Sequence, residues 1–146
     1  MRPSEFQPVD DGVRGGKETI LAVEDESALR DLVHEILEGY GYRVLQASNG
    51  LQALEVWRRH RNEIDLLFTD MMMPEGVSGR ELAEILTSEK QELKVVYTSG
   101  YSVDVVASDM NFEEGYNFLQ KPYNPDRLAK TVRNCLDAAA ESAQTE

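Results

Sequence analysis

Hydrophobic residues gather in five short runs along the chain, and polar segments separate these runs. The first run is Thr19-Ile20-Leu21-Ala22-Val23. Short runs that are apolar throughout are typical of strands buried on both faces of a sheet. The sequence therefore predicts five strands, at residues 19–23, 42–45, 65–69, 93–97 and 116–119.

Between the strands, apolar residues recur at the three- and four-residue spacing of helices. Gly39 and Gly41 end the first of these segments, and Asn49-Gly50 turns into the second. The residues expected on apolar helix faces are Leu29, Leu32, Val33, Ile36 and Leu37, then Leu51, Leu54 and Trp57, then Leu82, Ile85 and Leu86, then Val105, Val106 and Met110 in a weak helix at 102–111, and finally Leu128, Val132 and Leu136. Strands and helices that alternate in this way predict an α/β fold, a doubly wound parallel sheet with helices on both faces.

The chain of 146 residues has the length of one domain. Residues 1–18 contain prolines and glycines without any apolar period, so we expect a flexible N-terminal lead-in. The domain itself is expected at residues 19–138, and a C-terminal tail without a further element at 139–146.

Composition and charge narrow the class of protein. The single cysteine, Cys135, excludes an internal disulfide framework and favours the reducing cytoplasm. No apolar run approaches the roughly 20 residues of a membrane helix, so no membrane partner is expected. The formal net charge of −12 repels phosphate backbones, so we also expect no nucleic acid. Cations and basic protein surfaces are the partners that this charge favours.

Polar residues follow four of the predicted strands directly at their carboxyl ends. They are Glu24 and Asp25, then Asp70, then Thr98 and Ser99, and finally Lys121. A single acid at a strand end is more often a helix cap or a turn residue. Ligands of open parallel sheets, however, bind beyond the carboxyl ends of the strands. Three acids, a hydroxyl and a lysine at this one edge therefore favour a functional site.

The chemistry of such a set points to phosphate and a hard cation. Clustered carboxylates raise one another's pKa values unless a cation joins them. All the candidate ligands are oxygens, and Mg²⁺ fits best because it uses one or two carboxylates together with phosphate oxygens and water. A lysine and a hydroxyl would satisfy the other oxygens of a phosphoryl group, and one carboxylate can be the nucleophile.

Four motifs carry these residues: Val23-Glu24-Asp25-Glu26, Thr69-Asp70-Met71-Met72-Met73-Pro74, Thr98-Ser99-Gly100-Tyr101 and Lys121-Pro122-Tyr123. Over roughly residues 19–138 they resemble the receiver domain of two-component response regulators. The pattern is most similar to receivers of hybrid histidine kinases. The resemblance implies a flavodoxin-like (βα)5 three-layer sandwich, with a parallel five-stranded sheet of order 2-1-3-4-5.

The resemblance also implies a role for each acid. Asp70 would be the phosphoacceptor, which takes a phosphoryl group from a histidine kinase or a histidine phosphotransfer protein. Asp25 and Asp70 would bind Mg²⁺ directly, together with the main-chain carbonyl of Met72. Glu24 would act through water. An apolar Met72, with Tyr101 on the other side, could shield the phosphoaspartate from hydrolysis.

The remaining motif residues would bind the phosphoryl group and transmit the signal. Lys121 would pair with Asp70 and later with the phosphate, and the Lys121-Pro122 bond is expected to be cis. Ser99 would hydrogen-bond the phosphoryl group and act as a switch with Phe118, although Thr98 competes for this role by one position. Phe118 lacks the hydroxyl of the tyrosine that is more frequent there, so its switch would work by packing alone.

The resemblance further implies a signalling module that is not an enzyme but assists its own phosphorylation and dephosphorylation. Its downstream target would be a protein that binds the face of the fourth helix, fifth strand and fifth helix, because no DNA-binding segment follows. The alternative in the same family is a receiver that serves as an interaction module without phosphorylation. An aspartyl phosphatase would need an acid in place of Met72, and a flavin protein would need a phosphate loop at Glu24-Asp25-Glu26, whose charge repels phosphate.

Overall fold

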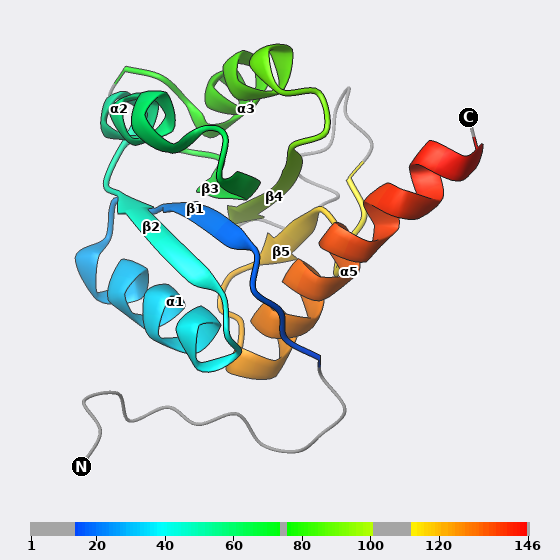
Figure 1. Cartoon of the computed structure of the whole chain (residues 1–146). Coiled ribbons are helices and arrows are strands. Elements are labelled where there is room, and N and C mark those ends of the chain that lie inside the picture. The colour runs from blue at the N-terminus through cyan, green and yellow to red at the C-terminus, as the bar shows by residue number, and fades with distance from the viewer. Residues whose placement is uncertain (1–13, 74–75, 101–111, 146) are drawn as a thin grey trace.

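The computed structural model describes residues 14–73, 76–100 and 112–145. Along them the elements follow in the order β1 (Thr19–Val23), α1 (Ser27–Gly39), β2 (Arg43–Ala47), α2 (Gly50–His60), β3 (Ile64–Asp70), α3 (Gly79–Glu89), β4 (Lys94–Ser99), β5 (Phe118–Gln120) and α5 (Pro125–Thr145) (Figure 1). The helix expected at 102–111 lies outside the described residues. The strands form one parallel sheet of order β2-β1-β3-β4-β5, which confirms the predicted topology.

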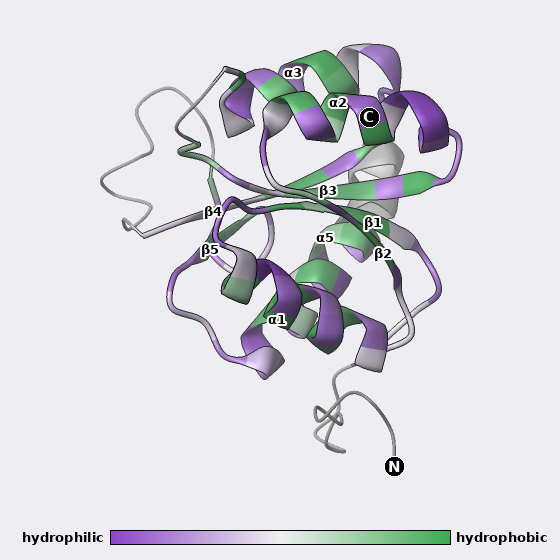
Figure 2. Cartoon of the chain, turned by 90° about the vertical axis from the view of Figure 1, so that its left-hand side faces the viewer, coloured by the Kyte–Doolittle hydropathy of each residue, from purple (hydrophilic) through white to green (hydrophobic). Residues whose placement is uncertain are grey.

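Helices cover both faces of the sheet, so the molecule has three layers. Figure 2 shows α2 and α3 on one face and α1 and α5 on the other. Successive residues of a strand point to opposite faces. Ile20 and Phe68 accordingly pack in the cluster under α1 and α5, whereas Leu21 and Leu67 pack in the cluster under α2 and α3. The uniformly apolar strands of the sequence are explained by this burial on two sides.

Local hydrogen bonds place the starts of two helices. The Asn49 side chain accepts a hydrogen bond from Gln52 N at 2.8 Å and caps α2. At α3, Ser78 Oγ accepts from Glu81 N at 3.1 Å, and the Glu81 carboxylate accepts from Ser78 N at 3.0 Å. This reciprocal capping box holds the start of α3 beside the end of β3.

The C-terminal segment corrects one expectation. The sequence predicted a tail without a further element at 139–146, but α5 continues to Thr145. Alanines at 138–140 are the best helix formers, and neither glycine nor proline interrupts the segment, so the helix continues. Among the described residues, no helix is both long and apolar enough to cross a membrane.

Several further expectations were wrong in detail. Leu32 was expected on the apolar face of α1, but it is 44% exposed. Leu51 was expected on the buried face of α2, but it is exposed at the start of the helix, where it faces the loop at Gly76. The fifth strand was expected to begin at residue 116 but begins at Phe118. The cause is a turn, because the backbone N–H groups of Tyr116 and Asn117 both bond to the Glu113 carbonyl, at 3.0 and 3.1 Å.

The last residues of the predicted lead-in pack against the domain. Gly16 N donates to the Tyr40 carbonyl at 3.2 Å, just after α1. On α5, the Arg133 guanidinium donates to the Gly15 carbonyl at 3.1 Å and pairs with Glu18 at 2.9 Å. Contacts with the domain therefore begin before residue 19, because two glycines allow a close approach of the backbone. Residues 1–13 lie outside the described part of the chain.

The single cysteine provides a test of the core on the α5 side. Burial raises the pKa of the Cys135 thiol to about 11 from an ordinary value of 9.0. The buried neutral thiol therefore contributes fully to the free energy of unfolding below pH 9. This contribution is lost as the pH rises toward 11. A pKa difference of this size corresponds to about 2 to 3 kcal/mol. The free energy of unfolding, measured with urea, should be higher for wild type than for Cys135→Ala at pH 8. At pH 11 this difference should be smaller by about 2 to 3 kcal/mol. A native thiol that reacts with a disulfide reagent at pH 8 as fast as the unfolded chain would contradict this burial.

Candidate functional site

The carboxyl edge of the sheet brings the predicted polar residues together. Glu24 follows β1, Asp70 ends β3 and Lys121 follows β5. β1 and β4 are the two neighbours of β3, so the ends of three strands meet around Asp70. Lys121 N donates to the Ser99 carbonyl at 2.7 Å, which joins the loop after β5 to the end of β4. The Lys121-Pro122 peptide is cis, as expected.

Lys121 bridges two buried carboxylates. Its Nζ lies 3.0 Å from Asp70 Oδ2 and 3.1 Å from Glu24 Oε1. Asp70 is 6% exposed and Glu24 is 4% exposed. Burial alone would lower the pKa of Lys121, but the hydrogen bond and charge of Asp70, together with Glu24, outweigh it and raise this pKa. The lysine is therefore held as a cation against the two acids.

Glu24 is buried and held by contacts to both its side chain and its main chain. Burial raises the pKa of Glu24 above its ordinary value, and the bonds from Glu26 N and Lys121 offset only part of this effect. Oε2 accepts from Glu26 N at 3.0 Å, while Oε1 faces Lys121. Arg30 donates to the Glu24 main-chain carbonyl at 2.7 Å, a contact that sequence analysis did not anticipate. Both carboxylate oxygens of Glu24 thus have one partner each.

Oxygens of three carboxylates converge in the same place. One oxygen each of Glu24, Asp25 and Asp70 lies within 4.8 Å of the others, and Asp25 is the exposed member of the group. Met72 N donates to Asp70 Oδ1 at 3.3 Å, and the Met72 side chain is 64% exposed. An all-oxygen set with more negative charge than Lys121 can neutralise suits a hard divalent cation such as Mg²⁺.

Both candidate hydroxyls lie at the end of β4. Thr98 pairs in register with Asp70, Ser99 is the next residue, and both side chains are buried. Thr98 Oγ1 has no hydrogen-bond partner within the described residues. The preference for Ser99 as the phosphoryl ligand therefore stays a prediction. Phe118 is fully buried, with its ring centroid 5.3 Å from that of Phe112, and its switch role also stays a prediction.

Sequence analysis assigned no role to two residues at this edge. Tyr123 follows the Lys-Pro pair, and its ring packs edge-to-face on Phe68 with a centroid distance of 6.3 Å. Gly79 begins α3 against the backbone of Asp70 and Met71. Tyr123 could have been singled out, because it belongs to the Lys-Pro-Tyr motif. The role of Gly79 could not, because it depends on a tertiary contact that a single glycine in a sequence does not reveal.

An apolar hollow of about 480 Å³ opens next to the acidic site. Leu29 and Leu32 of α1 line one side, and Pro122 and Tyr123 line the other. Lys121 belongs to both the hollow and the acidic site, so the two adjoin. Glu26 supplies a negative charge at the hollow.

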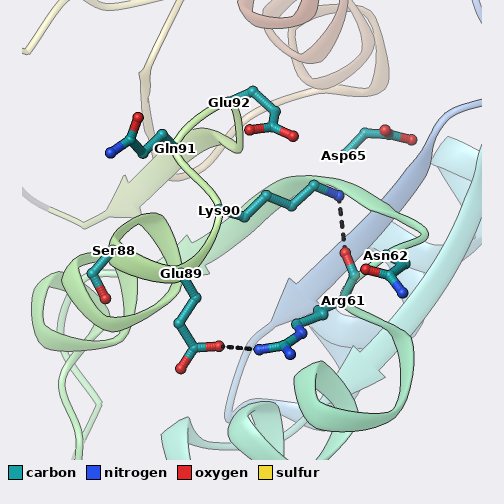
Figure 3. Close-up of a pocket in the computed structure, with 8 residues that line it drawn as sticks. All are labelled: Arg61, Asn62, Asp65, Ser88, Glu89, Lys90, Gln91 and Glu92. Carbon is teal, nitrogen blue, oxygen red and sulfur yellow. Dashed lines mark hydrogen bonds and ion pairs between the residues drawn. The ribbon is translucent and has the colours of Figure 1, made fainter.

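A second, polar hollow lies at the opposite edge of the sheet, between the ends of α2 and α3 (Figure 3). Four of its charged side chains, those of Arg61, Asp65, Glu89 and Lys90, bond to one another or to the backbone. Arg61 pairs with Glu89 at 3.0 Å, and Lys90 Nζ donates to the Arg61 carbonyl at 2.9 Å. Because both cations of this hollow are already paired, the carboxyl edge around Asp70 is the stronger candidate for the functional site.

A doubly wound sheet that holds three carboxylates and a lysine at its carboxyl edge is typical of response regulators. Comparison with known families agrees, since the response regulator receiver domain family matches residues 20–133. The chain belongs to this family of signalling modules.

Several relatives resemble the chain over most of its length. The sensor kinase CckA of Brucella abortus is 34% identical over 84% of the chain, although the match spans only 13% of that kinase. The response regulator receiver protein CpdR of Brucella abortus is 32% identical over 82% of the chain and 98% of CpdR. The crystal structure of the receiver domain from the hybrid histidine kinase CckA superposes with a TM-score of 0.67 at 35% identity, over 81% of this chain and 98% of that one. The predicted similarity to hybrid-kinase receivers is confirmed.

Proposed function

We propose that this receiver accepts a phosphoryl group on Asp70 from a phosphohistidine, in a reaction that needs Mg²⁺, and passes the signal on through protein contacts. The donor would be a histidine kinase or a histidine phosphotransfer protein. The observation that carries the proposal is the Lys121–Asp70 ion pair of 3.0 Å inside a cluster of carboxylates. The module is a phosphoacceptor and not an enzyme with a separate substrate.

In the transfer step, a carboxylate oxygen of Asp70 attacks phosphorus and forms the O–P bond of an acyl phosphate. The N–P bond of the phosphohistidine breaks, and its electron pair stays on the imidazole nitrogen. Lys121 already contacts Asp70 and would stabilise the negative charge of the phosphoryl oxygens. Ser99 would donate a hydrogen bond to one of these oxygens, with Thr98 as the competing donor.

The residues present fit a magnesium ion. Asp25 and Asp70 would bind it directly with the main-chain carbonyl of Met72, and Glu24 would bind it through water. When bound, Mg²⁺ neutralises charge on the phosphoryl oxygens and helps to orient them. Asp25 is the exposed acid of the cluster, which suits an ion that keeps several of its waters.

The apolar hollow beside Lys121 supports a helical donor. Leu32 is an exposed leucine on α1, and Leu29 and Tyr123 continue its apolar surface toward the acidic site. An amphipathic helix that laid its apolar residues in such a groove could present a phosphohistidine to Asp70. Two relatives of the chain are named for phosphoryl-transfer signalling, the sensor kinase CckA of Brucella abortus and the sporulation initiation phosphotransferase F of Bacillus subtilis. Their names support a donor of this class.

The signal would leave through the face of β5, α5 and the helix expected at 102–111. Charge added at Asp70 would draw Ser99 toward the phosphoryl group, and Phe118, which is already fully buried, would respond by a change of packing. The target would be a protein, because the net charge of −12 disfavours nucleic acid. The single cysteine favours the cytoplasm as the place of action.

The decisive experiment is the intact mass of the protein after incubation with acetyl phosphate and Mg²⁺. We expect a gain of one phosphoryl group and no gain when a chelator removes the metal. A phosphorylated histidine phosphotransfer domain in place of acetyl phosphate tests the class of donor. A folded protein that binds Mg²⁺ but gains no mass would instead support an interaction module without phosphorylation.

A further inference from the structure

The loop between β1 and α1 carries two of the three clustered acids, Glu24 and Asp25. The start of α1 has no side-chain cap, because Glu26 occupies the capping position without making a capping hydrogen bond. The starts of α2 and α3, by contrast, are fixed by Asn49 and Ser78. The position of the β1–α1 loop therefore depends on other contacts.

Arg30, in the first turns of α1, supplies such contacts. Its Nη1 donates to the main-chain carbonyl of Glu24 at 2.7 Å, and its backbone N–H donates to the Glu26 carbonyl at 2.9 Å. A charged donor at this distance forms one of the stronger hydrogen bonds in a protein. Glu26 N also donates to Glu24 Oε2 at 3.0 Å. The residues on either side of Asp25 are thus both tied to Arg30.

Asp25 itself has no such support. Its side chain is exposed and makes no hydrogen bond or ion pair with the part of the chain that the structure describes. Before a cation binds, only the backbone holds this carboxylate beside Glu24 and Asp70. The peptide unit is planar, so a bond to the Glu24 carbonyl oxygen also fixes Asp25 N in the same unit. Arg30 thereby limits the directions in which the Asp25 side chain can point.

We propose that Arg30 is a positioning residue for the magnesium site. By holding the Glu24-Asp25 peptide, it keeps the Asp25 carboxylate beside the other two acids. The inference rests on the proposed function, which assigns Mg²⁺ to these residues. Removing a group that orients a metal ligand from behind weakens metal binding by about 10- to 100-fold. The charge of Arg30 acts in the opposite direction, because a cation next to the acids repels Mg²⁺. Positioning and charge therefore predict changes of opposite sign.

The test is Arg30→Met, which removes the donor and the charge but keeps an unbranched apolar stem. Arg59→Met is the matched control, since Arg59 is an exposed residue of α2, on the other face of the sheet. Mg²⁺ is titrated without a phosphoryl donor, and the amide NMR signals of Asp25 and Met72 give the dissociation constant. We expect Arg30→Met to bind Mg²⁺ about tenfold more weakly than wild type. Arg59→Met should bind it as wild type does.

Arg30→Lys separates the bond from the charge. Lysine keeps the positive charge and a donor, but its shorter side chain lacks the planar guanidinium. Its affinity for Mg²⁺ should therefore lie between those of wild type and Arg30→Met. If only the charge mattered, Arg30→Met would bind Mg²⁺ more tightly than wild type. That result would overturn the proposal, and so would an unchanged dissociation constant.

Urea unfolding checks that the variants are folded during the titration. Arg30 is only half-buried, so we expect Arg30→Met to stay folded. If it did not, Arg30→Lys would decide, because weaker binding than wild type supports the proposal and equal binding overturns it. If wild type bound Mg²⁺ but gained no mass from acetyl phosphate, the proposed function alone would fail. If phosphorylation occurred but Arg30→Met bound Mg²⁺ as wild type does, only the role of Arg30 would fail.

Discussion

Replacing Asp70 with asparagine should leave a folded protein that gains no phosphoryl group from acetyl phosphate and Mg²⁺. The amide has nearly the size of the carboxylate, and Lys121 keeps its second partner, Glu24, at 3.1 Å. An amide oxygen is a poor nucleophile, however, so the covalent step is lost and not merely slowed. Intact mass spectrometry should find less than about 1% of the wild-type product, a loss of more than 2.7 kcal/mol in transition-state stabilisation.

Asp65→Asn provides the matched control for this change. Asp65 lies near the other end of β3, where it accepts a hydrogen bond from Thr19 N at 3.0 Å. An asparagine oxygen can accept the same bond, so phosphorylation should stay at the wild-type level. A phosphoryl group on Asp70→Asn, at the extent seen in wild type, would move the phosphoacceptor to another residue and refute the proposed function.

Gly79→Ala should be the most damaging small substitution near the site. A methyl group at Gly79 would overlap the Asp70 carbonyl oxygen and would lie 2.9 Å from Met71 Cα. Both contacts are with backbone, which cannot rotate away, and Gly79 N also donates to the Met71 carbonyl at 3.1 Å. The start of α3 and the Asp70-Met71 peptide must separate, so we expect a loss of about 2 to 3 kcal/mol in the free energy of unfolding.

The same shift should slow phosphorylation, because Met71 is bonded directly to Asp70 at the end of β3. Urea unfolding and the initial rate of mass gain are the two measurements. Gly100→Ala is the control for stability, since a methyl group there meets no atom of the described residues within 4 Å. If Gly79→Ala unfolded at the same urea concentration as Gly100→Ala, the close packing of α3 on the phosphoacceptor strand would be wrong.

Much of the fold could be predicted because its signals are local. The uniformly apolar strands and the helical spacing between them predicted a parallel sheet with helices on both faces, and the sheet order followed from the resemblance to receivers. Errors fell where local signals were weak. Leu51 has the right spacing for a buried face, but a first-turn residue can point toward a neighbouring loop. The boundary at residue 18 was placed too late, because glycines can form a flexible segment or allow close packing, and spacing does not distinguish the two.

By itself, the sequence determined which residues end the strands, and the carboxyl ends of parallel strands share one edge of the sheet. That rule was sufficient to collect Glu24, Asp70 and Lys121 as candidates. Only the tertiary structure decided how they pair, since β1, β3 and β5 are far apart in the chain. The division of Lys121 between two buried acids and the contact of Gly79 with the phosphoacceptor strand both depend on distances between such segments. Hydrogen bonds and close contacts form over a few ångströms in space, and spacing along a sequence does not encode them.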